Sequence, residues 1–211
     1  MDRLKEITNA IIDGKNNEIT HLINDALSEG YGALTILNEG LIPGMDEVGK
    51  LWNEGEIFIP EVLISARTMT TASTLIEEVL LSEGHKPIAK AIIGTVKGDL
   101  HDIGKNLVGM MLKGKGFDVI DLGVDVSKEQ YLEAVKESGA KFVVCSSLIT
   151  TTMTYMEEVI DYFKQEGLKD EVVIACGGAP VTQTFADKIG ADVYTDDAVS
   201  LAKTLVEMVE K

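Results

Sequence analysis

The chain has 211 residues, of which 45% are hydrophobic and 26% are charged, as is ordinary for a globular protein that folds in water. Its 35 acidic and 19 basic side chains give a formal net charge of −16, which repels phosphate backbones and argues against nucleic acid as a partner. No apolar run reaches the roughly 18 residues of a membrane span, and the start lacks a signal peptide's apolar block, so we expect a cytoplasmic protein with no membrane partner.

The first part of the chain, up to about residue 85, has the apolar periodicity of amphipathic helices. Leu4, Ile7 and Ile11 fall on one helical face, because side chains three or four positions apart are neighbours on a helix. Pro60 suits the first turn of the longest helix. Four helices joined by short breaks predict a small four-helix bundle. They are expected over residues 4–11, 19–27, 34–52, where the segment GLIPG interrupts the pattern, and 60–79.

From about residue 88 the pattern changes to short apolar runs that alternate with amphipathic segments. Continuous apolar runs are typical of strands in a parallel sheet that helices cover on both faces. The sequence therefore predicts an α/β fold with a doubly wound, five-stranded parallel sheet, whose ligands bind beyond the carboxyl ends of the strands. Cys145 and Cys176 lie inside two runs and are expected to be buried thiols. The runs are AIIGTV, DVIDLG, KFVVCSSL, VVIACGG and ADVYT, and the expected domains are 1–87 and 88–211.

A histidine between carboxylates follows the first predicted strand, in the stretch GTVKGDLHDIG. In an extended loop, residues two positions apart point the same way, so Asp99 and His101 should lie side by side. A carboxylate that holds one ring nitrogen fixes the tautomer and leaves the other nitrogen free, the usual arrangement of a metal-binding histidine. The alternative is a solvated turn. The candidate residues of this loop are Gly98, Asp99, His101, Asp102 and Gly104.

Small and hydroxyl-bearing residues end the other predicted strands. The third run leads into Ser146, Leu148 and Thr150, and the fourth ends in the pair Gly177–Gly178. Each glycine alone is more often a turn residue, but small residues gathered at one edge of a sheet leave room for a deep slot. These strand ends favour a long, buried ligand tail.

Three motifs in this order and spacing resemble the cobalamin-binding module of methionine synthase and its relatives. They are D-x-H-x-x-G at Asp99–Gly104, S-x-L at Ser146–Leu148, and Gly177–Gly178. The stretch TVKGDLHDIGKNLVG is especially similar, and GLIPGMDEVGKLWNEGEIFIPEVLISARTM resembles the cap domain of the same family. The resemblance covers nearly the whole chain. It implies a helical cap domain before a Rossmann-like, flavodoxin-type domain, as in the corrinoid proteins of methylamine, methanol and betaine methyltransferase systems.

The resemblance also implies roles for individual residues. In this family the benzimidazole of the cofactor leaves cobalt and the motif histidine replaces it, so His101 would be the lower axial ligand of a base-off/His-on cobalamin. Asp99 would hold the other ring nitrogen, and Ser146 would continue the hydrogen-bonded chain. The nucleotide tail would lie beside Gly94, Gly123, Leu148, Thr150, Gly177, Gly178 and Ala198, and Met45, Val48 and Trp52 would cover the methyl-bearing face of the corrin unless they are simply bundle core.

The implied function is that of a methyl carrier, a non-catalytic subunit that alternates between cob(I)alamin and methylcob(III)alamin. A substrate-specific methyltransferase, expected to be a TIM barrel, would load it from a methylated amine, a betaine or methanol. A second methyltransferase would pass the methyl group to tetrahydrofolate or a thiol coenzyme, and a reductive activation protein would restore oxidised cobalt. The sequence does not identify the methyl donor.

Three alternatives belong to other functional classes. A cobalamin-sensing regulator can share the same two domains, but it carries a DNA-binding domain with a basic surface, which this acidic chain lacks. A receiver-type signalling domain needs a phosphoacceptor aspartate in an acidic pocket, whereas the first strand here leads into glycines. A zinc hydrolase is disfavoured because His21 and His85 lie in the helical half, far in sequence from His101.

Overall fold

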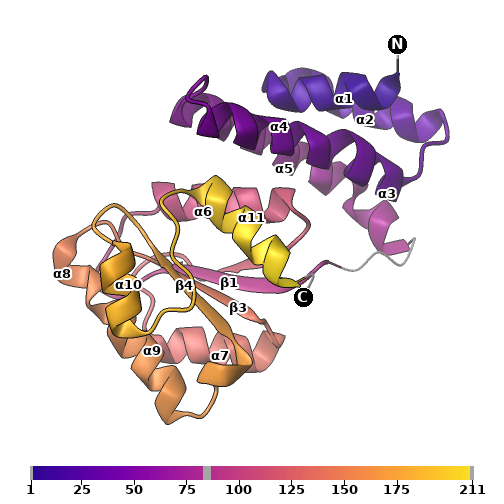
Figure 1. The fold of residues 1–211 in the computed structure, drawn as a ribbon. Helices are drawn as coiled ribbons and strands as arrows, with labels where there is room; N and C mark the ends of the chain where they lie inside the picture. The colour runs from indigo at the N-terminus through magenta and orange to yellow at the C-terminus, as the bar shows by residue number, and fades with distance from the viewer. Residues whose placement is uncertain (1, 83–86, 210–211) are drawn as a thin grey trace. The chain divides into compact units, whose positions relative to one another are not determined.

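The computed structural model describes residues 2–82 and 87–209, which form two compact units (Figure 1). One unit holds Met1–Lys86 together with Lys113–Lys115, and the other holds Pro87–Leu112 together with Gly116–Lys211. His85 and most of the stretch expected to join the two domains lie outside the described residues. No helix in the described ranges is long and apolar enough to cross a membrane.

The first unit is made of helices whose predicted apolar faces are buried. Helix α1 packs against α2, α4 and α5, and α2 packs along α5. Ile7, Ile11, Ile19 and Ile23 are completely buried, because helical spacing directs them to the same side of their helices. The helices are α1 (Arg3–Ile12), α2 (Asn16–Ser28), α3 (Ala33–Thr35), the π-helix η1 (Ile36–Leu41), α4 (Ile42–Asn53) and α5 (Ile59–Ser82).

The expected break at GLIPG is wrong, because helical structure continues without interruption from Ala33 to Asn53. A π-helix spans the junction, and its wider hydrogen-bond ladder accommodates a proline that cannot donate, here in the first turn of α4. The glycines serve helix packing instead. A Cβ on Gly44 would lie 2.7 Å from Cβ of Ile11, and one on Gly40 would lie 3.1 Å from Cγ2 of Ile7, so both glycines allow close approach to α1.

The second unit is an α/β fold built on a parallel sheet with strand order β2-β1-β3-β4. Helices α7 and α9 cover one face, and α6 and α11 cover the other (Figure 1). The strands are β1 (Lys90–Thr95), β2 (Asp118–Asp121), β3 (Phe142–Ser146) and β4 (Val173–Gly177). The helices are α6 (Ile103–Gly114), α7 (Lys128–Ser138), α8 (Thr150–Met153), α9 (Tyr155–Gln165), η2 (Lys169–Glu171), α10 (Gln183–Ile189) and α11 (Ala198–Val209).

The sheet has four strands in the described part of the chain, not the five expected. The run ADVYT forms a single parallel bridge, between Val193 and Ala175 of β4. One reason is Asp192, whose carboxylate accepts the Ile174 N–H at 2.7 Å. The Asp192 side chain thus occupies a backbone N–H that a longer strand would need for its own backbone hydrogen bonds. The chain therefore leaves the sheet after one bridge.

The two cysteines are confirmed as buried free thiols. They lie in one register row of the sheet, in which Gly94 of β1 pairs with Cys145 of β3, and Cys145 pairs with Cys176 of β4. Both belong to the core between the sheet and helices α7 and α9.

Candidate functional site

The predicted histidine loop lies where the strand order reverses. The chain leaves β1 after Thr95 and enters α6 at Ile103. Strand β2 pairs with one side of β1 and β3 with the other, so the helical connections diverge on either side of this loop. In open α/β sheets such a switch point is where ligands bind. The loop over residues 96–102 therefore occupies the position that the fold favours for a functional site.

The structure brings Asp99 and His101 into direct contact. Oδ1 of Asp99 lies 2.7 Å from Nδ1 of His101 and also accepts the backbone N–H of His101 at 3.0 Å. The Asp99 side chain is completely buried, whereas the His101 side chain is 54% exposed. The ring is therefore held from below at Nδ1 and left accessible to solvent and ligands.

The second oxygen of Asp99 is held by the loop after β3. Oδ2 accepts hydrogen bonds from the Ser147 hydroxyl at 3.0 Å, the Leu148 backbone N–H at 2.8 Å and the Thr152 hydroxyl at 2.9 Å. Burial alone raises the pKa of the Asp99 carboxyl, but these donors and those of His101 lower it well below its ordinary value of 3.8. Asp99 is therefore an ionised carboxylate that can only accept hydrogen bonds.

The ionised state of Asp99 fixes the state of the imidazole. Because the carboxylate has no proton to donate, Nδ1 of His101 must carry the proton that they share at 2.7 Å. In the neutral ring this leaves a lone pair on Nε2, and that lone pair is the group that binds metals. Among the described residues, no three histidine, cysteine, aspartate or glutamate side chains come together as a metal cluster, so His101 offers one protein ligand.

Ser146 does not occupy the position in the hydrogen-bonded chain that was expected for it. The hydroxyl groups on Asp99 come from Ser147 and Thr152, which also lie 2.8 Å from each other. Ser146 is the last residue of β3, and side chains alternate across a strand, so Ser147 rather than Ser146 faces Asp99. Two adjacent serines gave no local sign of which would face it, and the sequence interpretation missed Thr152.

The residues that follow His101 stabilise the start of α6. The carboxylate of Asp102 accepts the side-chain N–H of Asn106 at 3.2 Å, and the backbone carbonyl of Asp102 accepts the backbone N–H of Asn106 at 2.7 Å. Lys105 is buried and donates to Asp121, at the end of β2, and to Asn106 at 2.7 Å. Asp102, expected to contact the cofactor, thus holds its own helix, and Lys105 links that helix to β2.

Several predicted glycines leave open space at this edge. A Cβ built on Gly104, Gly123 or Gly177 would meet no other atom within 4 Å. Gly178 differs, because a Cβ there would collide with the carbonyl oxygen of Ser147. The first three positions therefore have open space that can face a ligand, although the φ of +83° at Gly123, like that of +124° at Gly178, also favours glycine.

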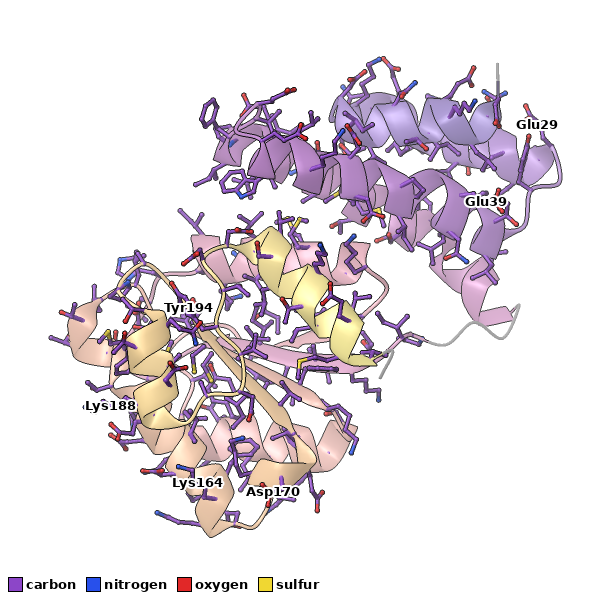
Figure 2. The ribbon with its side chains drawn as sticks, in the orientation of Figure 1. Glu29, Glu39, Lys164, Asp170, Lys188 and Tyr194 are labelled. Atoms are coloured by element: carbon purple, nitrogen blue, oxygen red, sulfur yellow. The ribbon has the colours of Figure 1, made fainter. Side chains whose placement is uncertain are left out.

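The other residues that were expected to lie beside the nucleotide tail differ in how exposed they are. A Cβ built on Gly94 would lie 2.7 Å from the Tyr131 hydroxyl inside the core, so Gly94 leaves no open space in that direction. Thr150 is exposed at the start of α8, and Ala198 is 9% exposed at the start of α11. Figure 2 shows Tyr194 far from Asp170, which precedes β4.

Exposed apolar side chains surround the histidine loop, and sequence reasoning missed most of them. Leu100 and Ile103 are 72% and 70% exposed on either side of His101. The neighbouring loops contribute Val124, Leu148 and Ile149, all of them more than a third exposed. Exposed apolar groups gathered at one place mark a ligand or partner surface more often than chance. A search for apolar residues inside the loops, rather than for polar residues, would have found them.

The helical unit also differs from expectation in what it exposes. Met45 and Val48 are almost completely buried, and Trp52 is half-buried. Phe58 and Ile59, in the turn into α5 and at its first residue, are 66% and 48% exposed. These two residues are the large apolar groups that this turn presents outward.

Comparison with known proteins identifies the family. Residues 89–203 match the family described as B12 binding domain, and residues 3–77 match a second family with the same description. The chain belongs to the B12-binding family. Cobalamin is accordingly the cofactor class that the family and the site residues indicate for it.

Corrinoid proteins are similar over the whole length of this B12-binding chain. A corrinoid protein of Desulfitobacterium hafniense (strain Y51) is 39% identical over 98% of both chains. Dimethylamine corrinoid protein 3 of Methanosarcina acetivorans is 40% identical over 96% of both. A chain in the crystal structure of the methanol:cobalamin methyltransferase complex MtaBC from Methanosarcina barkeri is 31% identical, with a TM-score of 0.86 over 99% of this chain and 80% of that chain.

Proposed function

We propose that this protein is a methyl-carrying corrinoid protein that holds cobalamin with His101 as the lower axial ligand of cobalt. Similarity to dimethylamine and trimethylamine corrinoid proteins over almost the whole chain supports the methyl-carrier class. The observation that carries the proposal is the half-exposed His101 ring, whose Nδ1 is held by the buried carboxylate of Asp99. This arrangement presents Nε2 as a neutral nitrogen ligand.

The surroundings of His101 fit the lower side of a corrin. A corrin is a broad disc that is largely apolar, with amide groups at its edge. Leu100, Ile103 and Leu148 expose apolar surface next to His101, which suits contact with such a disc. Gly123 and Gly177 leave space at the ends of the neighbouring strands, which suits a nucleotide tail displaced from cobalt. The described residues thus fit the cofactor by its shape, polarity and ligand chemistry.

The Asp99–His101 pair also holds a proton, which lies on Nδ1 of the imidazole. When bound, cobalamin supplies a nucleophilic cobalt that accepts and donates a methyl group. Nδ1 of His101 carries a proton that the ionised carboxylate of Asp99 accepts at 2.7 Å, so the lone pair of the neutral ring is on Nε2. Ser147 and Thr152 keep Asp99 ionised by donating to its other oxygen. Through these contacts the chain's own residues would keep Nε2 as the nitrogen of His101 that binds the metal.

The helical domain, expected over residues 1–87, is proposed to shield the opposite, methyl-bearing face of the corrin from water. Met45, Val48 and Trp52 remain candidates for that contact, and the exposed side chains of Phe58 and Ile59 join them. The partners in this proposal are a substrate-specific methyltransferase, expected to be a TIM barrel, a second methyltransferase and a reductive activation protein. A relative's place in a methanol:cobalamin methyltransferase complex supports the first of these.

Reconstitution tests the proposal directly. Apoprotein is incubated with hydroxocobalamin, passed through a desalting column and examined for a stoichiometric corrinoid spectrum. The loaded protein is then reduced anaerobically and offered to candidate methyltransferases with monomethylamine, dimethylamine, trimethylamine, glycine betaine or methanol. Methylation of the bound cofactor by one pair of enzyme and donor is the expected result. A protein that stays colourless after incubation contradicts corrinoid binding, and a coloured protein that no enzyme methylates contradicts the carrier role.

A further inference from the structure

Asp125, in the loop after β2, has an unusual backbone conformation. Its φ is +56°, and it is the only non-glycine residue with positive φ in the described part of the chain. This region is unfavourable for a residue with a Cβ, although aspartate and asparagine tolerate it better than most. Asp125 is also exposed, so core packing does not explain its conformation. Strain of this kind persists where surrounding contacts impose it, and it clusters at functional sites.

The contacts that impose it come from the histidine loop. The carboxylate of Asp125 accepts the backbone N–H of Gly98 at 2.7 Å. The backbone N–H of Asp125 donates to the carbonyl of Asp99 at 3.0 Å. Asp125 therefore binds the residue before Asp99 with its side chain and Asp99 itself with its main chain.

The loop that carries Asp125 is itself anchored to β1. Val126 forms a parallel bridge with Val96, and its N–H donates to the Thr95 carbonyl at 2.9 Å. The Thr95 N–H donates in turn to the Gly123 carbonyl at 2.9 Å. Asp125 thus lies between Gly123 and Val126, which are both hydrogen-bonded to β1. Its own hydrogen bonds then hold the turn before His101 in place.

We infer that Asp125 is a positioning residue that sets the orientation of the Asp99–His101 pair. The carboxylate of Asp99 is fixed at one end by Ser147, Leu148 and Thr152. Asp125 fixes the main chain of Asp99. The Asp99 side chain is therefore held both at its carboxylate and at its backbone, and this restricts it to one orientation. Because Nδ1 of His101 follows the Asp99 carboxylate, the direction of Nε2 follows as well. The consequence for cobalt rests on the proposed function, whereas the consequence for the His101 ring does not.

Three substitutions separate the hydrogen bond from the backbone strain. Asp125→Asn keeps an acceptor oxygen and tolerates positive φ. Asp125→Gly removes the acceptor and relieves the strain, and Asp125→Ala removes the acceptor while keeping the strain. Glu137→Ala is the matched control, since it also removes one exposed carboxylate from the same unit, in α7. If the hydrogen bond positions the loop, the glycine and alanine variants should behave alike.

The first measurements use the apoprotein and do not depend on cobalamin. Amide hydrogen exchange at Gly98 should be about 10- to 100-fold faster in the glycine and alanine variants, because a hydrogen bond to a charged acceptor is lost. Ring nitrogen chemical shifts should show that His101 loses its single Nδ1–H tautomer in the same two variants. The asparagine variant and Glu137→Ala should resemble the wild type. Unchanged exchange and an unchanged tautomer in the alanine variant would overturn the inference.

The second measurement uses protein loaded with cob(II)alamin, in which an axial nitrogen splits the electron paramagnetic resonance signal. The ratio of nitrogen-ligated to unligated cobalt should fall roughly tenfold in the glycine and alanine variants, as for other groups that orient a metal ligand, and asparagine should restore it. Full splitting in the alanine variant overturns the positioning role at cobalt. A wild type without splitting contradicts the proposed function, while the apoprotein measurements still decide the inference about Asp125.

Discussion

The carboxylate of Asp99 and the imidazole of His101 are 2.7 Å apart, yet one side chain is completely buried and the other is 54% exposed. The pair therefore spans the boundary between the protein interior and the ligand side of the sheet. The buried member is held by donors that keep it ionised, and the ring of the exposed member is held by it at Nδ1. This asymmetry lets the protein determine the orientation of a ring nitrogen that is still accessible to a metal.

Replacing the proposed ligand should separate cofactor binding from cobalt ligation. His101→Ala should still bind cobalamin, because the open strand ends at Gly123 and Gly177 and the apolar residues of the loops are unchanged. The nitrogen splitting in the electron paramagnetic resonance spectrum of bound cob(II)alamin should disappear. Retention of that splitting in the alanine variant would show that another nitrogen binds cobalt.

Asp99 should stabilise the fold in a way that depends on pH. Its pKa in the folded protein lies below the ordinary value of 3.8, so its contribution is complete well above that value and is lost as the pH falls below it. At pH 7, Asp99→Asn should lower the free energy of unfolding by about 2 kcal/mol, since charged hydrogen bonds are removed. Urea denaturation of both proteins between pH 7 and pH 3 tests this. A difference that stays constant below pH 4 would contradict the ionised state.

Adjacent serines provide a matched pair of variants at the second oxygen of Asp99. Ser147→Ala removes a donor to Asp99 and should destabilise the protein by roughly 1–2 kcal/mol. It should also reduce nitrogen ligation to cobalt, because the orientation of Asp99 becomes less restricted. Ser146→Ala removes a hydroxyl that does not bind Asp99 and should leave nitrogen ligation unchanged. Equal loss of ligation in both variants would restore the role expected from the S-x-L motif.

The two glycines at the end of β4 should respond differently to a side chain. Gly177→Val should leave stability nearly unchanged, because a Cβ there meets no other atom within 4 Å. It should weaken cobalamin binding roughly tenfold or more, as expected when extra atoms crowd a packed contact. Gly178→Ala should lower the melting temperature, because its φ is +124° and the Cβ collides with Ser147. Normal cobalamin affinity of Gly177→Val would place the nucleotide tail elsewhere.

The apolar turn of the helical unit should protect reduced cobalt. If Phe58 covers the methyl-bearing face, Phe58→Ala should leave cobalamin bound and make the reduced cofactor oxidise several-fold faster in air. Trp52→Ala tests the half-buried candidate in the same assay, and Leu34→Ala is the control for loss of an exposed apolar side chain in this unit. Oxidation rates equal to that of the wild type in both test variants would contradict shielding by this turn.

Local pattern predicted the features of this protein that depend on neighbouring residues. The helical faces of α1 and α2 and the Asp99–His101 contact follow from spacings of two to four residues, because helix and strand geometry fix the direction of side chains at such spacings. The parallel strands follow from continuous apolar runs. The position of the loop at the carboxyl ends of the strands followed from the order of strands and helices along the chain, whereas its place at a switch point required the strand order β2-β1-β3-β4. The D-x-H-x-x-G, S-x-L and G-G motifs also indicated the B12-binding family, because the residues of each motif lie within a short segment of the sequence.

The tertiary structure decided which distant groups meet. Ser147, the first residue after β3, reaches Asp99 from 48 residues away in the chain, and no spacing within either loop specifies that contact. Asp192 ends the pairing beside β4 after one bridge because its carboxylate reaches Ile174, eighteen residues away. Asp125 adopts positive φ because Gly98 and Asp99 bind it from another loop. In each case the partner is chosen by packing across the sheet, which is a property of the assembled fold and is absent from any local segment.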